Sequence, residues 1–118
     1  TKETTGIVDE DFIKTMRKGA LLVNTARGGL FKNLDVLESG LKSGHLGGVG
    51  TDVLPKEPPD GHSLINAWKN FDPWLYGRFV VTPHTAYYSE SALYDMRYKA
   101  AETASLFLKR NELRNRIV

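Results

Sequence analysis

A chain of 118 residues with 41% hydrophobic and 25% charged residues has the composition of one globular domain or part of one. Its formal net charge of +2 is too small to indicate a nucleic acid or a membrane surface as a partner, and no segment has the unbroken apolar length of a membrane span. The absence of cysteine excludes disulfides and thiolate chemistry and is compatible with a reducing compartment such as the cytoplasm. The chain begins at Thr1 with residues that resemble the middle of a domain, so we expect a fragment of a longer protein.

The first predicted unit is a short helix followed by a strand. Asp9 is suited to cap the helix, and Gly19 is suited to end it after the basic pair at 17–18. The apolar run at 20–23 shows no alternation, which is typical of a strand buried on both faces of a parallel sheet. Ligands of such sheets bind beyond the carboxyl ends of the strands, so Arg27, in the following turn, is a candidate for chemistry. An arginine that only pairs with a carboxylate in a loop is the alternative.

The second predicted unit is a helix and a glycine-rich strand. Asn33 is a plausible N-cap, Gly44 ends the helix, and Gly40 inside it indicates close contact with a sheet. A short strand is expected at about 48–53, with Asp52 near its carboxyl end. The glycines at 47–50 lack the preceding strand and following helix that a dinucleotide fingerprint requires.

The third predicted unit follows a long irregular segment. Residues 55–78 contain four of the five prolines and an aromatic stretch at 68–76, and 63–70 could form one or two helical turns. A loop of this length is more often functional or an interaction surface than a passive connection. A strand is expected at 79–82, where Pro83 ends the hydrogen-bonded ladder, so that His84 emerges just beyond it.

The last element is a long helix from the N-cap Ser89 to about Lys109. Its predicted apolar stripe is Leu93, Met96, Ala100, Ala104 and Phe107. The basic residues at its end are read as a solvated helix terminus; they are Lys109, Arg110, Arg114 and Arg116. Alternating strands and helices predict right-handed crossovers in a parallel α/β sheet, and three strands make half of a doubly wound domain.

The three predicted strand ends carry residues that could handle a carbonyl acid. A guanidinium such as that of Arg27 can hold a carboxylate through two parallel hydrogen bonds. His84 can exchange a proton with a hydroxyl or carbonyl oxygen near neutral pH, and Asp52 or Glu57 could orient its ring. A surface histidine or a loop glutamate is usually structural, which is the alternative for each residue taken alone. No cluster shows a zinc-ligand spacing, so no metal is predicted.

Four stretches in order resemble the NAD-dependent D-2-hydroxyacid dehydrogenases. They are Val23-Asn24-Thr25-Ala26-Arg27-Gly28-Gly29-Leu30, Leu41-Lys42-x-Gly44-x-Leu46-Gly47-Gly48, Asp52-Val53-x-x-x-Glu57-Pro58 and Thr82-Pro83-His84-x-Ala86. The resemblance implies the C-terminal half of a doubly wound, parallel-sheet, Rossmann-type NAD-binding domain spanning 1–118, with the glycine-rich half and the substrate domain missing upstream. The helix at about 89–109 would return toward the substrate domain.

The resemblance also implies roles for individual residues. Arg27 would bind the substrate carboxylate and polarise its carbonyl, His84 would be the acid/base, and Glu57 would pair with His84. The positions expected to bind the cofactor NAD are Thr4, Thr25, Ala26, Arg27, Asp52, His84, Ala86 and Tyr87, with Asp52 accepting from the nicotinamide carboxamide. The implied protein is a cytoplasmic homodimer that interconverts a 2-oxo acid and a D-2-hydroxy acid, and this chain alone is expected to be inactive.

Two positions depart from the commoner family pattern. Thr51 replaces an apolar residue, and Tyr87 replaces a glycine. The run Tyr87-Tyr88-Ser89-Glu90 resembles the branch that contains the C-terminal binding proteins, which are NAD-sensing corepressors. A non-catalytic NAD-sensing dimer is therefore the alternative function, although a pure sensor has no evident need for a proton-transfer pair.

Overall fold

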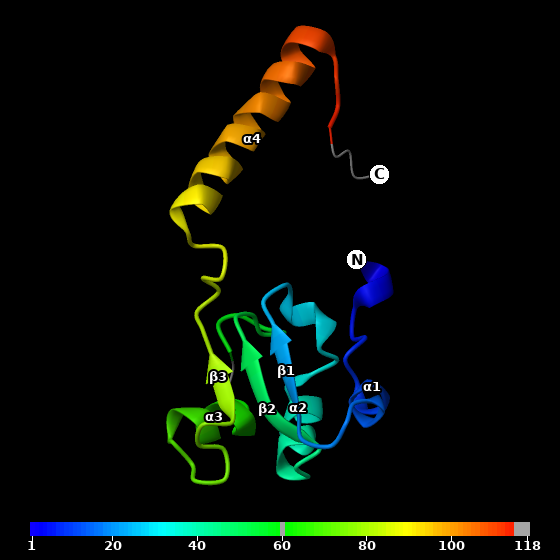
Figure 1. Ribbon diagram of the computed structural model, residues 1–118, viewed down its shortest axis with the longest axis vertical. Coiled ribbons are helices and arrows are strands. Elements are labelled where there is room, and N and C mark those ends of the chain that lie inside the picture. The colour runs from blue at the N-terminus through cyan, green and yellow to red at the C-terminus, as the bar shows by residue number, and fades with distance from the viewer. Residues whose placement is uncertain (60, 115–118) are drawn as a thin grey trace. The chain divides into compact units, whose positions relative to one another are not determined.

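The computed structural model describes residues 1–59 and 61–114. These residues divide into two compact units, one that ends at Ala86 and one that begins at Tyr87. The first unit holds a three-stranded parallel sheet in the order β1-β2-β3 (Figure 1). Its strands are β1 (Ala20–Asn24), β2 (Leu46–Thr51) and β3 (Phe79–Val81). Its helices are α1 (Glu10–Thr15), α2 (Leu34–Lys42) and α3 (Ser63–Lys69), with 3-10 turns η1 (Lys2–Thr4) and η2 (Gly28–Leu30). The predicted parallel α/β architecture is confirmed.

Two of the predicted caps in this unit form as expected. The Asp9 side chain accepts a hydrogen bond from the Phe12 N–H at 2.8 Å, and the Asn33 side chain accepts one from the Val36 N–H at 3.0 Å. The predicted end of α1 is wrong, because the helix stops at Thr15 and Met16 is already extended. Gly19 has the expected positive φ of 82°, but its N–H donates to His45 O at the start of β2, so 17–19 belong to the turn into the sheet.

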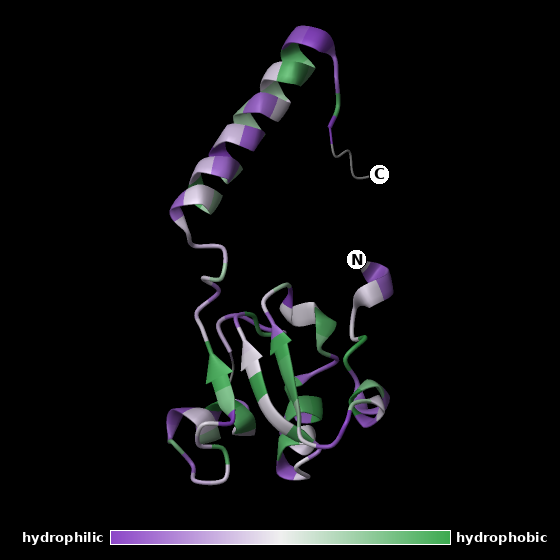
Figure 2. Ribbon diagram, viewed as in Figure 1, coloured by the Kyte–Doolittle hydropathy of each residue, from purple (hydrophilic) through white to green (hydrophobic). Residues whose placement is uncertain are grey.

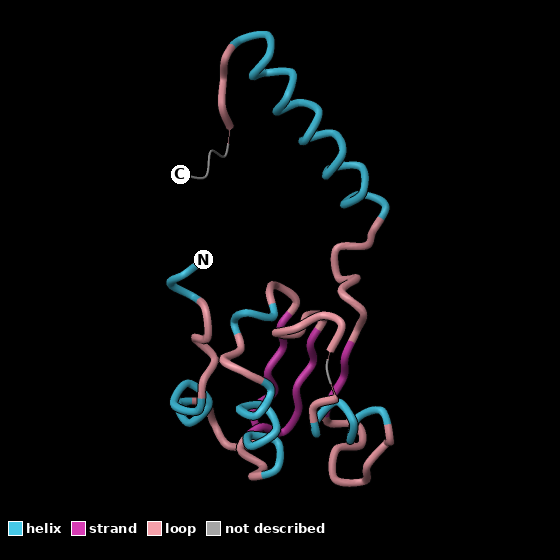
Figure 3. Tube along the Cα trace, turned by 180° about the vertical axis from the view of Figure 1, so that it is seen from behind, coloured by secondary structure: helices cyan, strands magenta, loops and turns pink. Residues whose placement is uncertain are grey.

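The hydrophobic core lies where α2 and α3 pack toward the sheet. Its most fully buried side chains are Leu37, Leu41, Leu46, Leu64 and Ile65. A β-carbon at Gly40 would lie 2.8 Å from Leu46 Cδ1, so the predicted close contact between helix and sheet is present. Both crossovers, β1-α2-β2 and β2-α3-β3, run in the same direction along the sheet, which places both helices on one face. Viewed from behind, they lie in front of the strands (Figure 3).

The opposite face of the sheet is exposed, which corrects the prediction that β1 is buried on both sides. Leu21 and Val23 are 74% and 72% exposed, and Val80 on β3 is also exposed. Their neighbours on β2 are Gly48 and Gly50, so the middle strand offers no side chain between them. Figure 2 accordingly shows hydrophobic β1 and β3 flanking a paler β2. An unalternated apolar run shows that both faces are apolar but not that both are covered.

The second unit consists mainly of α4 (Glu90–Arg110), close to the predicted range. The Ser89 hydroxyl accepts from the Ala92 N–H at 3.1 Å, and Asn111 ends the helix in the left-handed conformation. None of the described residues of α4 is buried. Arg116, part of the basic end, lies outside the described residues. No helix in the described part of the chain is both long and apolar enough to span a membrane.

Candidate active site

The carboxyl ends of the three strands are aligned by the sheet register. Asn24 pairs with Thr51, and Thr51 pairs with Val81, so the strands end in one row. Backbone hydrogen bonds continue past that row, because Asp52 N–H donates to Asn24 O at 2.9 Å and His84 N–H donates to Asp52 O at 3.0 Å. The loops after the three strands therefore begin side by side, as the sequence predicts.

Asn24 shapes the loop that carries Arg27. Its buried side chain accepts from the Ala26 N–H and donates to Arg27 O, both at 3.0 Å. This is the local turn chemistry for which asparagine is suited, so the residue could have been found from its place at the strand end. The Arg27 side chain is exposed, and its Nη1 donates to Ala26 O at 2.9 Å. Its guanidinium makes no ion pair with any carboxylate in the described part of the chain.

Gly28 brings this loop against the loop after β2. A β-carbon at Gly28 would lie 1.9 Å from Leu54 O and 2.8 Å from Pro55 N. The close approach of two backbones is possible only without a side chain. Gly28 thereby holds Arg27 next to the segment that leads to Glu57.

Glu57 and His84 form the central pair of the site. Glu57 Oε2 accepts a hydrogen bond from His84 Nδ1 at 2.7 Å, and Oε1 accepts from the Leu54 N–H at 2.7 Å. The hydrogen bond from His84, followed by that from Leu54, lowers the pKa of Glu57 below its ordinary 4.5. Because Nδ1 carries the proton toward Glu57, Nε2 is the nitrogen left to exchange a proton with a substrate. Among the described residues no group hydrogen-bonds to Nε2.

Asp52 organises the turn that follows β3. Its carboxylate is 4% exposed; Oδ1 accepts from the Thr82 hydroxyl and from the Thr85 N–H at 2.9 Å, and Oδ2 accepts from the Ala86 N–H at 2.8 Å. The Thr82 hydrogen bond is the largest influence on the pKa of Asp52, and together with the amide donors it lowers that pKa below 3.8 against the opposing effect of burial. Neither Asn24 nor Thr82 was among the predicted site residues.

One cavity of about 260 Å³ joins several of the predicted residues. It is lined by Asp52, Leu54, Glu57, Pro58, Pro59, Thr82, Pro83 and His84. The lining does not include Thr25, Arg27 or Ala86, which lie on the flanking loops. Thr4 is exposed, and its hydroxyl donates to Thr1 O beside η1. Tyr87 is the first residue of the second unit, where its ring contacts that of Tyr88 edge to face at 6.3 Å. The structure thus gathers the carboxylates and the histidine, and the cofactor roles remain predictions.

The long segment at 55–78 divides between two places. Pro58 and Pro59 line the site cavity, whereas the aromatic stretch surrounds another cavity of about 280 Å³ that reaches Phe79 at the amino end of β3. That end is opposite to the strand ends that carry the candidate site. The glycines at 47–50 all lie within β2 rather than in a phosphate-binding loop. Gly47 allows a close approach to the preceding turn, because a β-carbon there would lie 2.4 Å from Gly19 O.

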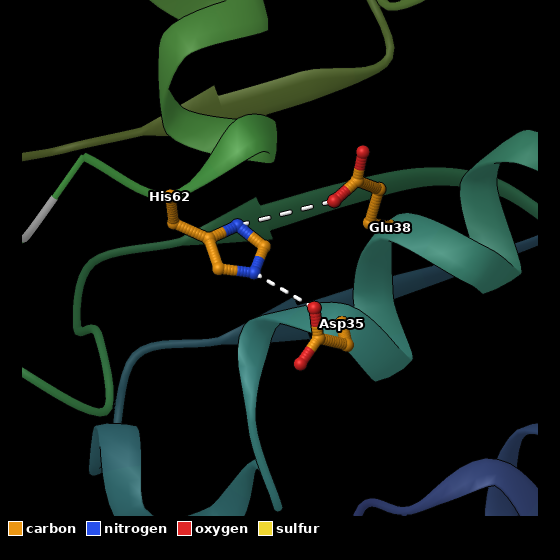
Figure 4. A group of neighbouring side chains, drawn as sticks. All are labelled: Asp35, Glu38 and His62. Atoms are coloured by element: carbon orange, nitrogen blue, oxygen red, sulfur yellow. Dashed lines mark hydrogen bonds and ion pairs between the residues drawn. The ribbon is translucent and has the colours of Figure 1, made fainter.

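A cluster of Asp35, Glu38 and His62 lies where α2 faces the start of α3 (Figure 4). Sequence spacing did not reveal it, because 27 residues separate Asp35 from His62. His62 Nδ1 accepts from the Leu64 N–H at 3.1 Å, so Nε2 carries the proton and donates to Asp35 at 3.0 Å. A metal ion on Nε2 would require a proton on Nδ1, directed at that same N–H.

Glu38 in this cluster already has a cation. Lys42 Nζ lies 2.6 Å from Oε1, and the Ser63 hydroxyl donates to Oε2 at 2.5 Å. Burial opposes ionisation of Glu38, but these two hydrogen bonds outweigh it and lower the pKa of the carboxyl. The cluster is therefore a hydrogen-bonded connection between α2 and α3 in which Lys42 pairs with Glu38.

Comparison with known proteins identifies the family. The family model described as the NAD-binding domain of D-isomer specific 2-hydroxyacid dehydrogenases matches residues 1–86. The chain belongs to this family. The strand-end site derived above lies entirely within the matched residues.

Individual relatives agree with the family assignment. The chain is 37% identical to a D-2-hydroxyacid dehydrogenase (NAD+) of Lacticaseibacillus paracasei, and the match covers 94% of this chain and 34% of the relative. It is 34% identical to a glycerate dehydrogenase of Methylorubrum extorquens, and that match covers 92% of this chain and 32% of the relative. The solved structure of a D-2-hydroxyisocaproate dehydrogenase is 36% identical and superposes with a TM-score of 0.72 over 95% of this chain and 35% of that one. The chain thus spans about a third of the length of the curated relatives it matches. Nothing in the comparisons favours the corepressor branch suggested by residues 87–90.

Proposed function

We propose that this chain is the C-terminal half of the NAD-binding domain of an enzyme that interconverts a 2-oxo acid and a D-2-hydroxy acid with NAD(H). The observation that carries the proposal is the Glu57–His84 hydrogen bond beside a cavity at the carboxyl ends of parallel strands. Membership of the NAD-binding family supports the choice of cofactor.

The proposed reaction assigns a task to each member of the site. When bound, NADH would supply the hydride for the carbonyl carbon of the 2-oxo acid. His84, protonated on both nitrogens, gives the Nε2 proton to the carbonyl oxygen, and Glu57 holds the resulting ring through Nδ1. Arg27 binds the substrate carboxylate through its two parallel N–H groups. In the reverse direction His84 removes the hydroxyl proton.

The residues present fit the nicotinamide end of the cofactor rather than the whole dinucleotide. The cavity of about 260 Å³ has room for a single ring or a small acid. We assign Thr25, Ala26, Asp52, Ala86 and Tyr87 to the nicotinamide end, and Thr4 to the cofactor as well. Among the described residues Asp52 Oδ2 accepts only the Ala86 N–H, which leaves it a lone pair for the carboxamide.

The proposal extends to the setting of the enzyme. We expect α4 to return toward a substrate domain encoded upstream, and the intact protein to be a homodimer. The cytoplasm is the proposed compartment, supported by a sequence without cysteine. Light scattering coupled to size exclusion of the intact enzyme tests the dimer.

Reduction of 2-oxo acids by NADH, followed at 340 nm, tests the function in the intact enzyme. We expect turnover in the wild type and a loss of about a hundredfold or more in kcat for His84→Gln, since general acid catalysis usually contributes that much. His45→Gln is the matched control, because His45 hydrogen-bonds Met16 O outside the site and its loss should leave turnover unchanged. Equal activity of wild type and His84→Gln would contradict the proposal.

A further inference from the structure

We propose that Thr82 is a positioning residue for the dehydrogenase reaction: its hydroxyl orients the Asp52 carboxylate, which holds the turn that presents His84 to Glu57. The inference rests on the proposed function and adds to it Thr82, which lines the same cavity but has no task in that scheme.

The first step is the set of donors around Asp52. The carboxylate accepts two backbone amides, from Thr85 and Ala86, and one side-chain hydroxyl, from Thr82. Thr82 follows β3 directly, and its own N–H donates to Thr51 O at 3.0 Å, so the hydroxyl is anchored to the sheet. The two amides, in contrast, belong to the loop that has to be held. The Thr82 hydroxyl is thus the one donor of the three with a fixed position against which the carboxylate can be aligned.

The second step is the conformation that the carboxylate maintains. His84 has a φ of 54°, in the left-handed region that L side chains rarely adopt. Its N–H donates to both Asp52 O and Thr82 O at 3.0 Å, and the next two N–H groups donate to the Asp52 carboxylate. Three consecutive amides after Pro83 are thereby directed at Asp52, and these hydrogen bonds compensate the unfavourable backbone of His84.

The third step connects this turn to catalysis. His84 Nδ1 lies 2.7 Å from Glu57 Oε2, although the His84 side chain is half exposed and only this hydrogen bond holds its ring among the described residues. The direction of the side chain is therefore set by the backbone at position 84 together with this one hydrogen bond. A change in that backbone would move Nε2, and a displacement of about 1 Å of a reacting group can cost a factor of a hundred in rate.

Two substitutions at Thr82 separate this role from simple packing. Thr82→Val retains the branched shape without the hydroxyl, and Thr82→Ser retains the hydroxyl without the methyl group. If the hydroxyl matters, the serine variant should resemble the wild type and the valine variant should not. If only packing matters, the valine variant should resemble the wild type and the serine variant should not.

The first measurement is amide hydrogen exchange by NMR in the 118-residue chain. In Thr82→Val we expect Thr85 and Ala86 to exchange at least about tenfold faster, while Val49, whose amide pairs within the sheet, exchanges as in the wild type. In Thr82→Ser all three should match the wild type. If Thr82→Val also loses protection at Val49, Thr82→Ala serves as the second variant without a hydroxyl. Unchanged protection of Thr85 and Ala86 in the variant that folds would overturn the proposal.

The second measurement is steady-state kinetics of the intact enzyme. We expect Thr82→Val to lower kcat for 2-oxo acid reduction by about ten- to a hundredfold, and Thr82→Ser to restore kcat. A valine variant with wild-type kcat, or a serine variant as impaired as valine, would overturn the positioning role. Absence of turnover in the wild type would instead refute the proposed function, and the exchange measurement would still decide whether Thr82 holds the turn.

Discussion

Glu57 and His84 are joined at 2.7 Å although 27 residues separate them in the sequence. The first feature that brings them together is the set of parallel strands, which end in one row. The second is Gly28, which allows the loop after β1 to lie against the backbone at Leu54. The Leu54 N–H in turn donates to Glu57. Neither residue is deeply buried, so their pairing is an arrangement of loops on a rigid sheet. Functional residues on loops that a rigid scaffold positions are the usual arrangement in this class of fold.

The first prediction concerns the charge of Glu57. Glu57→Gln in the intact enzyme removes the anion beside the His84 ring, so the imidazolium is less stabilised. Carbonyl reduction requires that imidazolium, so the upper pH limit of the reaction should move to lower pH. The pH profile of kcat/KM for 2-oxo acid reduction measures the shift. An unmoved upper limit would mean that Glu57 is only a loop carboxylate.

The next prediction concerns the acidic limit of the ionised Glu57–His84 pair, which depends on the lowered pKa of Glu57. Hydrogen bonds from His84 and Leu54 lower that pKa below 4.5, so the ionised pair persists to more acidic pH than an ordinary glutamate would allow. A group whose pKa is lowered on folding contributes stability above its unfolded pKa and loses it as the pH falls through the folded value. In His84→Gln the largest of these influences is absent, and the carboxyl titration of Glu57 followed by ¹³C NMR should move upward toward 4.5. An unchanged midpoint would show that the hydrogen bond does not form in solution.

The second prediction concerns the contact between two loops. Gly28→Ala places a β-carbon 1.9 Å from Leu54 O, so the backbones must separate. We expect a loss of about 3 kcal/mol in the free energy of unfolding, at the upper end of what overpacking costs. Gly29→Ala is the matched control, because a β-carbon there meets nothing within 4 Å and its φ is not positive. Urea denaturation of both variants provides the comparison, and similar losses would show that the loops do not meet.

The third prediction concerns the cluster at the start of α3. His62 Nδ1 caps α3, so His62→Ala should lower the free energy of unfolding by about 1 kcal/mol, while His62→Asn, which can cap in the same way, should recover most of it. Added Zn²⁺ should leave the melting temperature of the wild type unchanged, since a metal ion on Nε2 conflicts with this cap. A rise in Tm of several degrees with Zn²⁺ that disappears in His62→Ala would identify a metal site instead.

Local signals were the reliable part of the sequence interpretation. Asp9, Asn33 and Ser89 each cap a helix within three residues, and all three were predicted because the interaction is complete within one turn. The end of α1 was not predicted, because Gly19 follows a suitable basic pair but its N–H pairs with His45 of a distant segment. Exposure of Leu21 and Val23 was also not predictable, since an apolar strand does not specify what covers it.

The site residues show the same division between local and long-range information. The positions of Arg27, Glu57 and His84 after strands were predictable from strand ends, and their roles from the family resemblance. The roles of Thr82 and His62 were not, because each acts through a partner about 30 residues away in the sequence. Their significance is visible only after the sheet and helices bring those partners together.

The last prediction concerns Tyr87, where the family more often has glycine. We expect its ring to wall the substrate pocket and to select the side chain of the 2-oxo acid. Selection of this kind is usually worth about 1–3 kcal/mol per methylene-sized change, so Tyr87→Gly should alter the relative kcat/KM for small and bulky 2-oxo acids by about tenfold or more. The alternative is that Tyr87 packs beneath α4 and contributes only stability.

Features of the second unit make these alternatives separable. Tyr87 is 51% exposed and contacts the ring of Tyr88, which is 69% exposed, so neither ring is buried against α4 in the described chain. Tyr88→Gly is therefore a matched control that removes an equal ring and adds equal backbone freedom one position later. In the intact enzyme, kinetics on a series of 2-oxo acids and a thermal melt should show a changed substrate order for Tyr87→Gly alone. A lower Tm with an unchanged order in both variants would refute the pocket role, because loss of packing affects the amount of folded enzyme and not its preference between two substrates.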